Sequence, residues 1–227
     1  MDARDILKDM ACKFEKKIDN NFNMNVKFEF KDENENVFLL ISDKKVHFKN
    51  SISEEIEGVF KTTGKVLKKI YKGEITAFTA AGKANVSDSA PLDWEFKDGY
   101  VPKNMDNFYY FIMHFFNTSK PERIVLGENH ARKVHGGNAI PLYYYPGMRS
   151  AWYMLKNGEQ MNEEGETDPF HQAVIIISGK GVAKIGDKKI EIKEKESYYI
   201  PPGSEQIILN KNEEPLVLIW LAWGEKA

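Results

Sequence analysis

The 227-residue sequence has little cysteine and little histidine: one cysteine, Cys12, and five histidines. A single cysteine forms no internal disulfide, and without a cysteine cluster there is no thiolate zinc site. No apolar run approaches the roughly 20 residues that a membrane-spanning helix needs, and the first residues lead into no apolar signal segment. We therefore expect a soluble, cytoplasmic protein that makes no integral membrane contact.

The sequence also has no large excess of positive or negative charge. The 32 Lys and Arg residues nearly balance the 34 Asp and Glu residues, which leaves a formal net charge of −2. This balance gives no electrostatic reason to expect nucleic acid as a partner. Hydrophobic residues make up 42% of the chain and aromatic residues 12%, which is enough to build a packed core.

The pattern of the chain changes near residue 120. Before this point helical periods alternate with short strands, and after it nearly every segment alternates like a strand and ends at a turn. We therefore predict an α+β domain over residues 1–118, with a mixed sheet and helices, and an all-β domain over residues 119–227. The second domain is expected to begin with a strand over residues 123–127. In the first domain we expect helices over residues 2–19, 66–73, 75–81 and 104–117. A further helix is expected to open at the capping box of residues 51–54 and to bury Val59 and Phe60. Strands are expected over residues 26–30, 37–41, 45–49, 83–87 and 92–96.

Three pieces of the second half follow one another in a distinctive order. A core strand, Val174–Ser178, ends at a glycine turn; a hairpin turns at Gly186-Asp187; and the strand Ser197–Ile200 ends at the corner Pro201-Pro202-Gly203. This order resembles the cupins, which are small double-stranded β-helix barrels, over roughly residues 121–227. The resemblance implies that the all-β domain is a cupin barrel.

The resemblance also implies where metal ligands would lie. Cupin enzymes usually carry two histidines one residue apart, a glutamate four residues after the second, and a third histidine three residues beyond the glycine of the Pro-x-Gly corner. Counted from Gly179 and Gly203, these positions hold Glu166, Asp168, Gln172 and Gln206 here. Two carboxylates and two amides bind a hard cation weakly and lack the imidazoles that hold redox-active metals. His171 lies beside the expected glutamate position, but strand alternation turns it outward if Gln172 faces the interior.

We therefore expect no required cofactor and keep a divalent metal as an alternative. Its candidate ligands are Glu166, Asp168, His171 and Gln206. A Pro169 bulge would be one way to turn His171 inward.

A barrel without metal still encloses an interior that is lined by alternate strand residues. Alternation places Asp168, Phe170 and Gln172 on one face of their strand, with Gln206 pointing at them. The aromatic segment of residues 143–153 adds an arginine, whose planar fork suits a carboxylate. The predicted ligand-binding residues of the barrel are thus Asp168, Phe170, Gln172, Gln206, Arg149 and Trp152. Trp152 and the neighbouring tyrosines are alternatively strand core or interface residues.

The first half contains a glycine, a short Ala- and Phe-bearing helix and a Gly-Lys strand start, over residues 70–84. With the order of its elements, this piece is similar to the sterol carrier protein 2-like family over about residues 2–118. The resemblance implies an apolar tunnel for lipids, lined by Phe108, Phe111, Ile112 and Phe115. The same four side chains could equally fill the centre of an ordinary core.

We predict non-catalytic binding, as a carrier or sensor, of a small, partly apolar or lipid-like ligand in the N-terminal tunnel, the barrel or both. The alternative is a metal-dependent enzyme of the isomerase, lyase or dioxygenase type with atypical ligands, so whether the chain is an enzyme stays open. The run Leu216–Trp223 is apolar on both faces, which suggests burial against either the other sheet or a second subunit, and we expect a homodimer.

Overall fold

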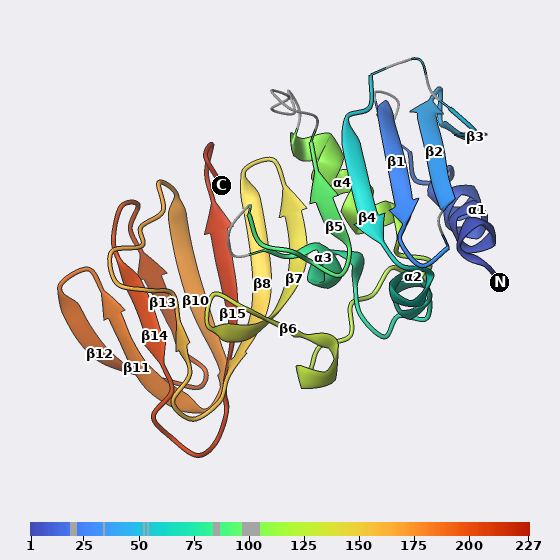
Figure 1. Ribbon diagram of the computed structural model, residues 1–227. Coiled ribbons are helices and arrows are strands. Elements are labelled where there is room, and N and C mark those ends of the chain that lie inside the picture. The colour runs from blue at the N-terminus through green and yellow to red at the C-terminus, as the bar shows by residue number, and fades with distance from the viewer. Residues whose placement is uncertain (19–21, 34, 52, 54, 84–86, 97–104) are drawn as a thin grey trace. The chain divides into compact units, whose positions relative to one another are not determined.

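The computed structural model describes residues 1–18, 22–33, 35–51, 53, 55–83, 87–96 and 105–227. The chain divides into two compact units, Met1–Val125 and Leu126–Ala227 (Figure 1). The boundary expected from sequence lies seven residues earlier.

The N-terminal unit is a five-stranded sheet with helices against one face (Figure 1). Its strand order is β3-β2-β1-β4-β5, in which only the β1–β4 pair is parallel. In chain order its elements are α1 (Ala3–Phe14), β1 (Met24–Phe30), β2 (Glu35–Ser42), β3 (Lys45–Lys49), β4 (Gly58–Thr62), α2 (Gly64–Tyr71), α3 (Ala77–Ala81), β5 (Asp93–Glu95) and α4 (Met105–Phe115).

Aromatic side chains form the centre of this unit. Along β1 every second residue is buried, and Phe28 lies on that buried face. Its ring centroid is 5.2 Å from that of Phe60 in β4 and 6.4 Å from that of Phe111 in α4. Phe14, at the end of α1, contacts Phe111 at 6.0 Å and Phe115 at 5.5 Å. Strand alternation and helical periodicity thus bring two strands and two helices to one ring cluster.

The prediction of a helix that opens at residue 51 is wrong for the residues that the structure describes. Residues 52 and 54 of its capping box lie outside the described residues, but Val59 and Phe60 lie in β4 rather than in a helix. β4 pairs in parallel with β1, and Phe60 stands beside Phe28. Val and Phe fit a pleated, half-buried surface, and this tertiary pairing overrides the local helix signal. Likewise, residue 19 of the first predicted helix and most of the predicted strand 83–87 lie outside the described residues.

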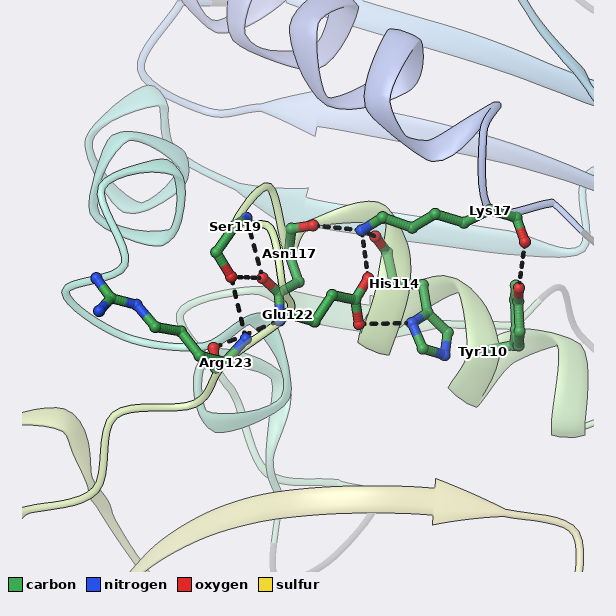
Figure 2. A network of polar contacts seen from close by, with 7 residues as sticks. All are labelled: Lys17, Tyr110, His114, Asn117, Ser119, Glu122 and Arg123. Atoms are coloured by element: carbon green, nitrogen blue, oxygen red, sulfur yellow. Dashed lines mark hydrogen bonds and ion pairs between the residues drawn. The ribbon is translucent and has the colours of Figure 1, made fainter.

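A polar network holds the segment after α4 against the rest of the N-terminal unit (Figure 2). Lys17 Nζ donates to the carbonyl oxygens of His114 (3.0 Å) and Asn117 (2.5 Å) and pairs with Glu122. His114 Nδ1 lies 2.8 Å from the other oxygen of Glu122, and the Tyr110 hydroxyl donates to the Lys17 carbonyl at 2.6 Å. These contacts tie residues beyond 118 to the N-terminal unit, which is why the division falls later than the sequence suggests.

The C-terminal unit is built from strands alone, apart from one short 3-10 turn. Its elements are η1 (Glu128–His130), β6 (Arg132–Val134), β7 (Gly137–Tyr145), β8 (Met148–Leu155), β9 (Gln160–Met161), β10 (His171–Ser178), β11 (Lys180–Ile185), β12 (Lys188–Lys193), β13 (Ser197–Ile200), β14 (Gln206–Leu209) and β15 (Leu216–Trp223). The strand expected over residues 123–127 is wrong, because no strand precedes β6 there. Val125 and Leu126 are exposed, so this apolar pair is not part of the core.

Two antiparallel sheets make up this unit (Figure 1). The larger has the order β13-β10-β15-β8-β7-β6 and the smaller the order β12-β11-β14-β9. Side chains from both form one buried cluster: Ala139, Ala151, Tyr153, Leu155, Met161, Val174, Ile176, Ala183, Ile192, Ile200, Ile208, Leu216 and Leu218. The inward-facing residues of the two sheets therefore share one core, as a small β-barrel requires.

No helix in the described part of the chain has the length and apolar character to cross a membrane.

Candidate functional site

Two glutamines from facing sheets meet inside the C-terminal unit. Gln172 lies on β10 of the larger sheet and Gln206 on β14 of the smaller one. The Gln206 Nε2 group donates to Gln172 Oε1 at 2.9 Å, and both side chains are almost fully buried, with 1% and 3% of their surface exposed. Strand alternation predicts that these residues face each other, and the hydrogen bond confirms it.

Trp220 completes this pair. It lies on β15, beside Val174 of β10, and packs against the barrel core. Its indole Nε1 donates to the same Gln172 Oε1 at 2.7 Å. Gln172 Oε1 thus accepts two hydrogen bonds, one from each sheet, which uses both of its lone pairs.

One acceptor in this cluster is unsatisfied. Gln206 Oε1 is buried and has no hydrogen-bond partner among the described residues. Leaving a buried acceptor unpaired costs about 1–3 kcal/mol. Native structures usually pair such an atom with protein, water or a ligand, so this oxygen marks a place where a hydrogen-bond donor fits.

Asp168 extends the cluster toward the corner at residues 201–203. Its carbonyl accepts from the Gly203 amide at 2.7 Å. Burial is the largest influence on the Asp168 carboxyl and raises its pKa. The charges of Arg149 and His135 and the polar side chain of Gln172 oppose that rise only in part.

The raised pKa makes a prediction for stability. Because the folded protein binds the Asp168 proton more tightly than the unfolded chain, whose pKa is near 3.8, this contribution to stability is full below pH 3.8 and is lost as pH rises through the folded-state pKa. Asp168→Asn is therefore expected to raise the free energy of unfolding at pH 7, with the difference from wild type shrinking as pH falls toward 4. Urea unfolding across this pH range measures the effect.

Glu205→Gln is the control of opposite sign. Glu205 pairs with Lys184 and accepts from the Gly165 amide at 2.7 Å, and its pKa is lowered, first by the lysine. Its neutralisation should lower stability at pH 7. An Asp168→Asn variant that is less stable than wild type at pH 7 would contradict the argument.

Arg149 lies near two aromatic rings of the C-terminal unit. Its guanidinium carbon is 5.6 Å from the Phe170 ring centroid and 5.8 Å from that of Tyr144. Its charge also lowers the pKa of Asp168, so the two charged groups interact. The cation thus lies near two aromatic rings, an arrangement that suits a guanidinium.

Trp152 does not join the predicted lining. It is three residues from Arg149, and alternation along β8 places Ala151 and Tyr153 in the barrel core and Trp152 on the other face. Tyr153 is the inward aromatic residue, and burial raises its pKa far above the usual value near 10. Counting every second residue along β8 from Arg149 reaches Tyr153 and not Trp152, so alternation predicts Tyr153 as the aromatic residue on the same face as Arg149. Trp220 was also missed, because its contact to Gln172 joins residues 48 apart.

The candidate metal ligands do not come together. His171 is exposed on the outer face of β10, where its Nδ1 lies 2.7 Å from the Tyr199 hydroxyl and its ring is 5.9 Å from that of Trp223. Among the described residues no three His, Cys, Asp or Glu side chains are grouped so that they could hold a metal ion. This donor set does not fit the metal that cupin enzymes use.

The predicted tunnel residues lie in the aromatic core of the N-terminal unit. Phe108, Phe111, Ile112 and Phe115 are all buried in α4. Phe108 lies 5.7 Å from Phe60 in a stacked arrangement, and Phe111 lies 4.6 Å from Phe115. These contacts account for the side chains as core residues, and their role in ligand binding stays a prediction. The homodimer also stays a prediction.

Comparison with known proteins identifies the C-terminal unit. Residues 151–222 match the family model described as a cupin domain, so this unit contains a cupin domain, as the sequence motifs predict. The match does not reach the N-terminal unit, which is a mixed α/β region, and the sterol carrier resemblance stays a prediction. A search of curated proteins finds no match to the chain.

Solved structures similar to the chain are also cupins. One is a Cupin 2 conserved barrel domain protein from Salinispora arenicola CNS-205, with 19% identity, 45% of this chain and 88% of that chain covered, and a TM-score of 0.41. Another is an RmlC-like cupin family protein from Methanocaldococcus jannaschii, with 21% identity, coverages of 42% and 86%, and a TM-score of 0.37. A shared fold does not by itself decide between an enzyme and a non-catalytic binder.

Proposed function

We propose that the C-terminal unit binds a small, partly apolar ligand without catalysis, as a carrier or sensor, inside its cupin barrel. The observation that carries the proposal is Gln206 Oε1, an acceptor that is buried and unpaired within the described residues. The atoms around it are hydrogen-bonded, because Gln172 accepts from both Gln206 and Trp220. A bound molecule that donates to this oxygen would recover the cost of burying it.

The interior of the C-terminal unit suits a molecule with both apolar and polar parts. Phe170 and Tyr153 are buried aromatic side chains of the same unit, and Ile208 lies two residues beyond Gln206 on β14. Gln206, Gln172 and Asp168 supply the polar groups. Ligand sites commonly combine apolar walls with a few well-placed polar atoms in this way.

The alternative of a metal-dependent isomerase, lyase or dioxygenase has weaker support. Its ligand set requires His171 to lie with Glu166, Asp168 and Gln206, whereas the imidazole of His171 is on the outer face of β10. The remaining carboxylates and amides suit a hard cation and not a redox-active metal. A tunnel in the N-terminal unit is likewise left out of the proposal, because its expected lining packs ring against ring.

Native mass spectrometry of the protein as purified tests the proposal. Wild type is expected to exceed its denatured mass by the mass of a small organic molecule, and Gln206→Leu should lose this excess because it removes the acceptor. His171→Ala is the matched control, since it removes an outward side chain of β10, and it should keep the excess.

Three outcomes would contradict the proposal. An excess that equals a metal ion would favour the enzyme, and an organic excess that survives Gln206→Leu would place the ligand elsewhere. No excess in wild type would point to water as the partner of Gln206.

A further inference from the structure

We infer that the barrel selects an uncharged ligand that donates a hydrogen bond, through an N–H or O–H group, to Gln206 Oε1. This inference rests on the proposed function and adds the chemical class of the ligand. It follows from the way the amide of Gln172 is held, because that amide sets the orientation of Gln206.

The orientation of Gln172 is fixed by Trp220. The indole Nε1 of Trp220 is a donor only, so the atom that it meets at 2.7 Å must be the amide oxygen of Gln172. Rotating the amide by 180° would set a donor against the indole N–H and would lose this hydrogen bond.

The orientation of the Gln206 amide follows from that of Gln172. Since Gln172 presents an oxygen, the group of Gln206 that lies 2.9 Å from it must be the NH2 group. The opposite orientation would place two amide oxygens in contact within a buried site, where like partial charges are poorly screened. The oxygen of Gln206 is therefore the atom that faces away from Gln172, and it is the atom without a partner in the described chain.

The hydrogen-bonding side chains of the site favour a neutral ligand. The side chains that hydrogen-bond to one another at the site, Gln172, Gln206 and Trp220, are all uncharged, so a charged ligand meets no opposite charge among them. An anionic group would meet an acceptor at Gln206 and gain nothing from it. Bringing a charged group into a buried site without a partner of opposite charge is costly.

Phenol and fluorobenzene test this inference as probes, because they have nearly the same shape and differ in one donor. Dissociation constants can be followed through the indole N–H signal of Trp220 in 15N-labelled protein, assigned by its loss in Trp220→Phe. We expect phenol to shift this signal at millimolar concentration and to bind about tenfold more tightly than fluorobenzene.

Gln206→Met should remove or reverse this preference, since methionine keeps the length of the side chain and supplies no strong acceptor. Gln160→Met is the matched control: Gln160 is exposed on β9, the neighbouring strand, and its loss should leave the preference unchanged. The comparison in wild type needs no variant and holds even if Gln206→Met fails to fold.

The inference is overturned if wild type binds fluorobenzene as tightly as phenol, if phenol shifts no Trp220 signal, or if folded Gln206→Met keeps the preference. An organic mass excess that depends on Gln206, together with equal binding of the two probes, would overturn the inference and leave the proposed function standing. A missing mass excess in wild type would count against the proposed function itself.

Discussion

Gly136→Ala is expected to lower the free energy of unfolding of the C-terminal unit by about 3 kcal/mol or more. Gly136 lies in the turn between β6 and β7, with a φ of +78°. A Cβ at this position would stand 1.9 Å from the carbonyl oxygen of Gln160. Backbone atoms cannot move aside as the end of a side chain can, so the turn or β9 must shift.

Gly158→Ala separates the strain of a left-handed alanine from the cost of the close approach to Gln160. Gly158 has nearly the same backbone conformation, with a φ of +80°, but a Cβ there meets nothing within 4 Å. Its replacement should cost only the strain of a left-handed residue, about 1–2 kcal/mol. Urea unfolding, followed through the tryptophans of the C-terminal unit, measures both variants. Equal losses would show that the close approach to Gln160 has no effect on stability.

The Gly136 turn also supports the candidate site. The Asn162 amide donates to the carbonyl of His135 at 3.2 Å, and the Asn162 side chain donates to the carbonyl of Gln206 at 3.2 Å. A shift of β9 caused by a Cβ at position 136 would therefore reach the backbone of Gln206. We expect folded Gly136→Ala to bind phenol more weakly than Gly158→Ala.

Periodicity predicted the features that depend on one strand or helix at a time. The alternation of apolar and polar residues correctly placed Gln172 inward and His171 outward on one strand. Where alternation was not applied, as with Trp152, the predicted residue lies on the other face.

Other contacts between distant strands were not predicted from the sequence. Trp220 and Gln172 are 48 residues apart, and neither has a neighbour in sequence that marks the hydrogen bond between them. β4 was expected as part of a helix because its strand character depends on pairing with β1, about 30 residues earlier. Both cases depend on which strands become neighbours, which local propensity does not encode.

Phe111→Ala is expected to lower the free energy of unfolding of the N-terminal unit by about 3–5 kcal/mol. Phe111 is fully buried, and its ring lies 6.0 Å from Phe14, 5.6 Å from Phe60 and 4.6 Å from Phe115. Removing it would leave a cavity between α4, α1 and the sheet that the surrounding rings cannot close, and the cost of such a truncation rises with the volume left empty.

Phe38→Ala is the matched control and turns the measurement into a test of the lipid tunnel. Phe38 alternates with the buried residues of β2, is only half-buried and has Lys27 Nζ 5.7 Å from its ring centroid, so its loss should cost less than about 1.5 kcal/mol. Hydrogen exchange at the Trp94 indole reports on the N-terminal unit separately from the tryptophans of the barrel. If Phe111 lined an apolar tunnel, one side of its ring would already lack packing partners, and its truncation would cost about as little as that of Phe38. A large difference between the two variants would mean that α4 fills the core, and the barrel would then be the part of the chain in which a ligand should be sought.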